Sequence, residues 1–202
     1  MKNAIKSLVA IFCIVGLSTA SAQIPGKAED ISPLLIGETL PKATLQDADG
    51  QKVQLKDILE EKPTVLVFYR GGWCPYCNLQ LSGLVDIENE IIGLGYQIVA
   101  ISPDDFQNLK VTIEDDSISY KLFSDPNGAL IKDIGIAFKT PVLVKGYIAT
   151  KKRKGKTSEV LPVPTVMIVD KKGNILFEYI SPNYKERISG DMLLAVLKTI
   201  EL

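Results

Sequence analysis

The chain has 202 residues, with 23 lysines and arginines against 24 aspartates and glutamates, and it contains no histidine. A net charge of −1 gives no electrostatic basis for general nucleic-acid binding, so we expect no nucleic-acid partner. The lack of histidine excludes His-activated nucleophiles, His-ligated zinc or copper, and haem with a histidine axial ligand.

The beginning of the chain has the layout of a secretory signal peptide. Two lysines precede an apolar run at residues 8–17, and small residues up to Ala22 follow. The run is too short to span a bilayer, which favours a signal over the alternatives, a membrane anchor or a buried helix. We expect export to a periplasm or out of the cell, with no stable membrane anchor after cleavage. Cys13 lies in this run, so the exported chain keeps only Cys74 and Cys77.

The remaining pattern alternates strands with helices after a leader with few periodic signals. In chain order we predict a hairpin, strand, helix, strand, helix, strand, helix, hairpin and helix, at residues 42–55, 64–69, 75–92, 97–102, 106–116, 120–124, 129–136, 165–180 and 189–202. Turn residues at Asp49-Gly50 indicate the first hairpin. The apolar run at 64–69 is typical of a parallel strand buried on both faces. This order predicts an α/β protein with a central mixed sheet flanked by helices.

Residues 139–160 are the least regular part of the sequence, and they contain a basic run at residues 151–156. Such a run fits a docking patch for an anionic surface or partner. It also fits a solvated loop or hairpin, and charge runs more often have this second role. The sequence does not assign the run a function.

The pair Cys74 and Cys77 is the main candidate for chemistry. Zinc needs about four ligands, whereas this chain offers two thiolates and no histidine, so we expect no metal. A structural disulfide across so short a loop would stabilise the fold only weakly. The pair follows a buried strand and two glycines, where a helix is predicted to begin, and Pro75 suits its first turn. Unpaired backbone N–H groups and the helix dipole favour a thiolate there, which predicts a redox pair.

The segment around these cysteines, FYRGGWCPYC at residues 68–77, resembles the active site of the thioredoxin superfamily. The region 36–202 is similar to the peroxiredoxin-like branch of the alkyl hydroperoxide reductase/thiol-specific antioxidant (AhpC/TSA) group. The resemblance implies a thioredoxin-like fold with an N-terminal β-hairpin. The chain then divides into a signal peptide at residues 1–22, a leader at 23–35 and one domain at 36–202.

The resemblance also implies roles for Val163, Pro164 and Thr165, at the start of the second predicted hairpin. In thioredoxin-like folds the proline at the position of Pro164 is cis and packs beside the Cys pair. The backbone of Val163 would then be free to pair with a substrate strand, with Thr165 beginning the next strand. The alternative is a plain proline at the start of a strand.

This sequence departs from its relatives at positions that matter for catalysis. Peroxiredoxins carry Pro-x-x-x-Thr/Ser-x-x-Cys, and alignment on Cys77 puts Arg70 at the proline position and Cys74 at the hydroxyl position. The family's distant arginine has no assignable match, and the only other arginines are Arg153 and Arg187. The buried carboxylate of thioredoxins is replaced by Phe68.

Three further residues flank the pair. Arg70 is expected to stabilise a thiolate or bind a substrate anion, or to be a surface charge at the strand end. Trp73 and Tyr76 are expected to line a substrate groove, or to cover the disulfide against water.

Three functions fit these features, and none needs a cofactor besides the redox-active disulfide Cys74–Cys77. In the leading hypothesis Cys77 attacks a hydroperoxide and Cys74 resolves the sulfenic acid, after which an extracytoplasmic dithiol reductant regenerates the pair. In the second hypothesis, a thiol-disulfide oxidoreductase, Cys74 attacks a protein disulfide and Cys77 resolves. In the third, the protein is a non-enzymatic binding domain with a stable disulfide.

Overall fold

The computed structural model describes residues 23–151 and 153–201, so the predicted signal peptide lies outside the described residues. The strands are β1 (Thr44–Gln46), β2 (Lys52–Gln54), β3 (Thr64–Phe68), β4 (Gln97–Ser102), β5 (Lys121–Ser124), β6 (Ala137–Lys139), β7 (Val160–Pro162), β8 (Thr165–Val169) and β9 (Ile175–Ile180). The α-helices are α1 (Leu55–Glu61), α2 (Pro75–Gly93), α3 (Gln107–Asp115), α4 (Ala129–Asp133), α5 (Val142–Ala149) and α6 (Gly190–Leu197). Two short 3-10 turns are η1 (Ala28–Asp30) and η2 (Pro126–Gly128).

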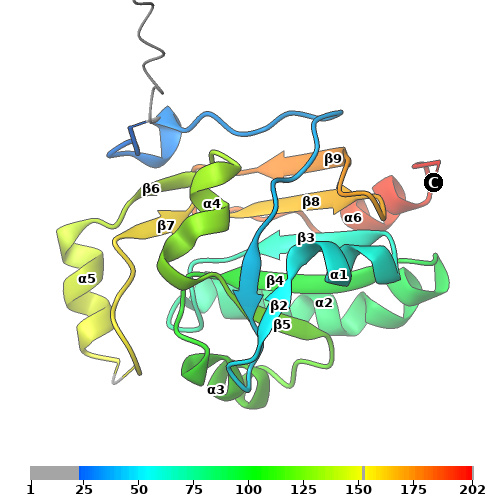
Figure 1. The fold of residues 1–202 in the computed structure, drawn as a ribbon. Helices are drawn as coiled ribbons and strands as arrows, with labels where there is room; N and C mark the ends of the chain where they lie inside the picture. Colours follow the sequence, from blue (N-terminus) through cyan, green and yellow to red (C-terminus); the bar gives the residue numbers. More distant parts are fainter. Residues whose placement is uncertain (1–22, 152, 202) are drawn as a thin grey trace, which may run out of the picture.

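Seven of the strands form one mixed sheet in the order β2-β1-β5-β4-β3-β8-β9 (Figure 1). The central strands β3, β4 and β5 run parallel, while β8 and β9 form an antiparallel hairpin beside β3. The β1–β2 hairpin lies at the other edge and turns at Gly50, whose φ of +80° is the conformation that favours glycine. The predicted α/β fold, with its mixed sheet and N-terminal hairpin, is confirmed.

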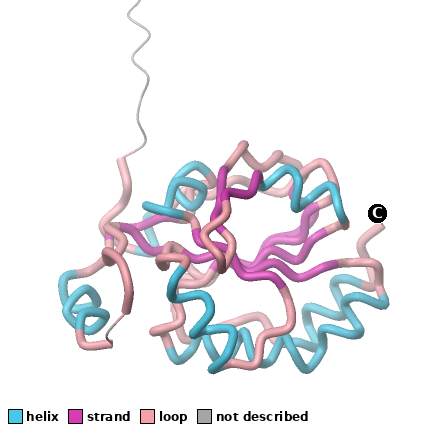
Figure 2. Tube along the Cα trace, turned by 60° about the horizontal axis from the view of Figure 1, so that its bottom comes forward, coloured by secondary structure: helices cyan, strands magenta, loops and turns pink. Residues whose placement is uncertain are grey.

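Helices cover both faces of this sheet (Figure 2). Successive side chains of a strand point to opposite faces, and β3 shows the consequence. Val65 and Val67 belong to a buried cluster with residues of α2, α3 and α6, whereas Leu66 and Phe68 pack with residues of α1 and α4. Because β3 is buried on both faces, its carboxyl end is a rigid support for the residues that follow it. Within the described residues, no helix has both the length and the apolar character needed to cross a bilayer.

Three features of the structure are not predicted by the sequence pattern. The helix α1 has only seven residues, too few to show helical periodicity clearly. The strands β6 and β7 have three residues each and form a separate two-stranded sheet. The helix α5 is apolar and contains Gly146, a poor helix former, in the segment that the sequence shows as irregular. It lies at one end of the molecule, beyond β6 and β7 (Figure 1).

Candidate thiol redox site

The strand β3 delivers the Cys pair to the first turn of α2. Cys74 is the N-cap residue of this helix, and Pro75 is its first helical residue. The backbone N–H of Cys74 donates to the Gly71 carbonyl over 3.1 Å, and the Cys74 carbonyl accepts from the N–H groups of Cys77 and Asn78 over 2.9 and 3.1 Å. Both cysteines are free thiols in this structure, and both are buried. The backbone therefore places Cys74 where unpaired N–H groups and the helix dipole favour negative charge.

The two thiols differ in acidity because of how they face each other. The pKa of Cys74 is lowered to about 6, chiefly because the Cys77 thiol donates a hydrogen bond to its sulfur, while the positive charges of Arg70 and Arg187 also lower it. The pKa of Cys77 is raised, first by burial and then by the neighbouring Cys74 sulfur. At neutral pH the negative charge of the pair therefore lies on Cys74, which makes it the stronger nucleophile.

Arg70 is buried beside the pair and is not a surface charge. Only 6 % of it is exposed. Its guanidinium carbon lies 4.9 Å from the ring centroid of Trp73 and 4.5 Å from that of Tyr184. Such cation–π contacts fix the side chain without neutralising its charge. Arg70 is therefore able to act on the Cys74 thiolate or on an anion that approaches it.

A cavity of about 350 Å³ opens onto Cys74. Its walls are formed by Arg70, Trp73, Cys74, Pro75, Tyr76, Leu143, Val144, Tyr147 and Tyr184. Two edge-on aromatic pairs shape it: Trp73 with Tyr147, with ring centroids 6.3 Å apart, and Tyr76 with Tyr184, at 5.6 Å. Trp73 and Tyr76 thus both line the cavity that opens onto Cys74.

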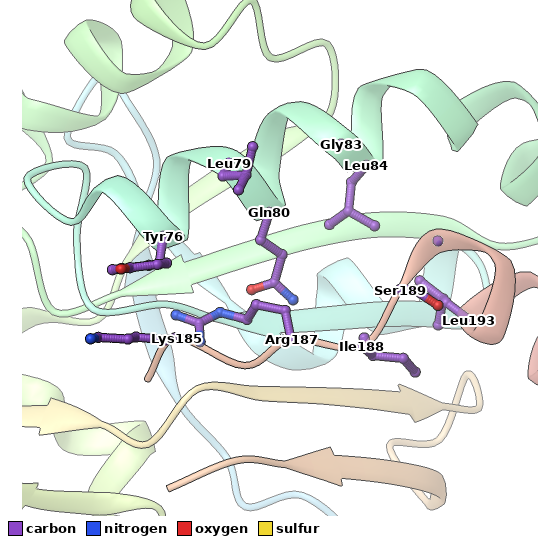
Figure 3. A pocket seen from close by; sticks show the side chains of 11 residues that line it. Tyr76, Leu79, Gln80, Gly83, Leu84, Lys185, Arg187, Ile188, Ser189 and Leu193 are labelled. Carbon is purple, nitrogen blue, oxygen red and sulfur yellow. The ribbon is translucent and has the colours of Figure 1, made fainter. Parts of the chain in front are cut away.

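A second cavity of about 350 Å³ lies between α2 and the segment before α6, and Arg187 lines it (Figure 3). The Nη2 atom of Arg187 is 3.7 Å from the Cys77 sulfur, and its Nη1 atom donates to the carbonyls of Tyr184 and Glu186. The structure therefore brings Arg187, rather than Arg153, to the Cys pair. Sequence reasoning named both arginines only because no others remained.

The expectations for the segment before β8 were wrong in two respects. The Val163–Pro164 bond is trans, since there is no cis peptide bond within the described residues. The backbone of Val163 is not free, because its N–H donates to the Ile136 carbonyl over 2.8 Å and its carbonyl accepts from the Thr165 hydroxyl over 2.9 Å. The Val163 backbone is occupied because the hydrogen bonding between β6 and β7, which was not predicted, extends one residue further, to Ile136 and Val163. The side chain of Val163 still packs in the same buried cluster as both cysteines.

Sequence reasoning missed Tyr147, Tyr184 and Asp104 as neighbours of the site. The two tyrosines come from distant segments and carry no local signal. Asp104 follows β4 and is joined to the loop before Cys74, since its Oδ2 atom accepts from the Gly72 N–H over 3.0 Å. A polar residue just beyond the carboxyl end of a parallel strand was the one signal that could have identified it.

Together, a mixed sheet, a CxxC pair at the start of a helix after the central strand, and one acidic thiol define the class of thioredoxin-fold thiol oxidoreductases. Within this class the chain belongs to the AhpC/TSA family, whose model matches residues 36–177, more than half of its length.

Two of the curated relatives differ in the activity that their names give. The peroxiredoxin bcp1 of Schizosaccharomyces pombe is 33% identical over 112 residues, which cover 55% of this chain and 57% of that protein. The match therefore spans little more than half the length of this relative. The thiol-disulfide oxidoreductase ResA of Bacillus anthracis is 27% identical over 190 residues, covering 94% of this chain and 95% of that protein.

Solved structures agree on the fold. Reduced Prx3 of Vibrio vulnificus in complex with H₂O₂ superposes with a TM-score of 0.69 at 20% identity, covering 81% of this chain and 99% of that one.

Proposed function

We propose that this protein is an exported thiol peroxidase that reduces hydroperoxides through a dithiol–disulfide cycle of Cys74 and Cys77. The observation that carries the proposal is the cavity over Cys74, the thiol whose pKa is lowered to about 6. A thiolate is the nucleophile that peroxide reduction needs. The family and the peroxiredoxin relatives support this activity.

The proposed cycle assigns Cys74 as the attacking thiol and Cys77 as the resolving thiol. This is the reverse of the order in the leading hypothesis from the sequence, and it is the order of the oxidoreductase hypothesis. The Cys74 thiolate attacks one peroxide oxygen, the O–O bond breaks, and the products are the Cys74 sulfenic acid and, after protonation, an alcohol or water. The Cys77 thiol then displaces the hydroxyl as water and forms the Cys74–Cys77 disulfide. A dithiol protein outside the cytoplasm supplies the two electrons and two protons that restore both thiols.

Arg70 has a defined part in this cycle. Its positive charge lies beside Cys74, and among the described residues Arg70 forms no salt bridge. It stabilises the thiolate before attack and the alkoxide or hydroxide that leaves the peroxide. Arg187, 3.7 Å from the Cys77 sulfur, favours the thiolate of Cys77 at the resolving step.

A second candidate function is thiol-disulfide exchange with proteins. It is favoured by the attack order, since Cys74 is the first cysteine of the CxxC pair, and by the match to ResA along 94% of this chain.

The non-enzymatic alternative is less consistent with the site, because a thiol with a lowered pKa stabilises the reduced form and makes a disulfide easier to reduce. Export rests on the residue pattern of positions 1–22 alone.

Titration of the reduced protein with hydrogen peroxide, without added reductant, tests the proposed activity. One equivalent of peroxide should consume both thiols, with the Cys74–Cys77 disulfide identified by peptide mass spectrometry. If the thiols survive excess peroxide while the protein reduces the disulfides of insulin, peroxidase activity is contradicted and the exchange function is supported.

A further inference from the structure

A buried ion pair lies directly behind the loop that carries Cys74. The Nη2 atom of Arg153 is 2.7 Å from the Oδ2 atom of Asp104, and the two side chains are only 13% and 11% exposed. The same oxygen accepts the Gly72 N–H over 3.0 Å. The guanidinium also reaches the Thr112 hydroxyl over 3.4 Å. A charge removed from water in this way needs its partner, and Asp104 Oδ2 has two, the Arg153 guanidinium and the Gly72 N–H.

The loop lies so close to the ion pair and its neighbours that a side chain at either glycine would meet them. A Cβ atom on Gly72 would lie 2.0 Å from the Thr112 Oγ1 atom and 2.8 Å from the Arg153 Nη2 atom. A Cβ atom on Gly71 would lie 2.4 Å from the Trp73 Nε1 atom and 2.8 Å from Asp104 Oδ2, and the φ of Gly71, +134°, also favours glycine. The Gly71 carbonyl in turn accepts the N–H of Cys74. A continuous set of contacts therefore runs from Arg153 to the backbone of Cys74.

Arg153 lies four residues beyond the helix that walls the cavity over Cys74. It follows α5, which supplies Leu143, Val144 and Tyr147 to that wall. The next residue, Lys154, is fastened to α3 through its backbone: its N–H donates to Asn108 Oδ1 over 2.8 Å, and its carbonyl accepts from Asn108 Nδ2 over 2.9 Å. The basic run is thus divided, with Arg153 turned inward and the Lys154 side chain exposed.

From this arrangement we infer that Arg153 is a positioning residue for Cys74, acting through Asp104 to hold the Gly71–Gly72 turn and the α5 segment in place. The inference rests on the proposed role of Cys74 as the nucleophile. The charge of Arg153 is paired with Asp104, whereas the arginines whose charges lower the pKa of Cys74 are Arg70 and Arg187. The effect of Arg153 is to keep Cys74 at the helix terminus where a thiolate is favoured.

The test compares Arg153→Met with Lys154→Met, a matched loss of one cation from the neighbouring position. The reduced proteins are alkylated with iodoacetamide between pH 4.5 and 9, and mass spectrometry locates the label. In Arg153→Met the pKa of Cys74 should rise by half a unit or more, which lowers the alkylation rate at pH 5 about three-fold. Lys154→Met should match the wild type, and Arg153→Lys, which keeps the charge beside Asp104, should fall between.

Arg153→Met leaves Asp104 without its partner, so the double variant Asp104→Leu/Arg153→Met serves if the single variant does not fold. It removes both charges and also the acceptor of the Gly72 N–H, so it should likewise raise the pKa of Cys74. Label on Cys74 at an unchanged pKa, in whichever of the two variants folds, overturns the positioning role. Initial label on Cys77 in the wild type overturns the assignment of the nucleophile itself. Alkylation needs no peroxide, so a protein that fails the peroxide titration still gives the Arg153 result.

Discussion

Replacement of Cys74 by serine should abolish the reaction with peroxide, whereas replacement of Cys77 should leave one round of oxidation intact. The reason is the division of acidity within the pair, where burial keeps Cys77 protonated and its thiol hydrogen bond helps keep Cys74 ionised. In Cys77→Ser the Cys74 sulfenic acid has no resolving thiol and should accumulate, where dimedone captures it. Stopped-flow peroxide consumption and mass spectrometry of the labelled protein measure both outcomes.

The opposite pattern would support the order that family alignment gives, with Cys77 at the position of the peroxide-attacking cysteine. Cys74→Ser would then consume one equivalent of peroxide and Cys77→Ser none. Both variants keep a small polar side chain at a buried position, so circular dichroism before the assay shows whether a loss of reaction is a loss of fold.

Replacement of Arg70 by methionine should raise the pKa of Cys74 by about one unit. That rise lowers the thiolate fraction at pH 5 about ten-fold, and peroxide reduction with it. Methionine fills the space between Trp73 and Tyr184 but carries no charge, so the change removes the cation and keeps most of the packing.

Lys185→Met is the matched control for this variant. Its ammonium lies 6.0 Å from the ring centroid of the same Tyr184, but Lys185 is exposed. Charge next to an exposed aromatic ring is screened by water, so this change should leave the pKa of Cys74 as it is. Equal shifts in the two variants would show that general positive charge, rather than the buried guanidinium of Arg70, sets the acidity of the thiol.

The parts of the fold that the sequence predicts well are those whose signals are local and periodic. The continuous apolar run that became β3, the helical spacing of Leu81 and Leu84 in α2, and the turn residues of the β1–β2 hairpin each specify one element. The expected sequence of strand, Cys pair and helix is present in the structure because all of its determinants lie within about thirty residues.

The rest of the site could not be predicted because it is assembled from distant segments. Tyr147, Tyr184 and Arg187 meet Cys74 and Cys77 only after the chain has passed through β8 and β9 or through α5. Arg153 was hidden in a basic run whose other members gave no sign that one would turn inward. The pairing of Val163 could not be predicted because the β6–β7 sheet is too short to leave an alternating pattern.

The pH dependence of Cys74 alkylation in the wild-type reduced protein tests the central claim most directly. A thiol with a pKa of about 6 gives a rate that rises through pH 5 to 7 and is constant above, with the label found on Cys74. A rate that keeps rising to pH 9, as for an ordinary cysteine, would contradict an ionised sulfur at the start of α2.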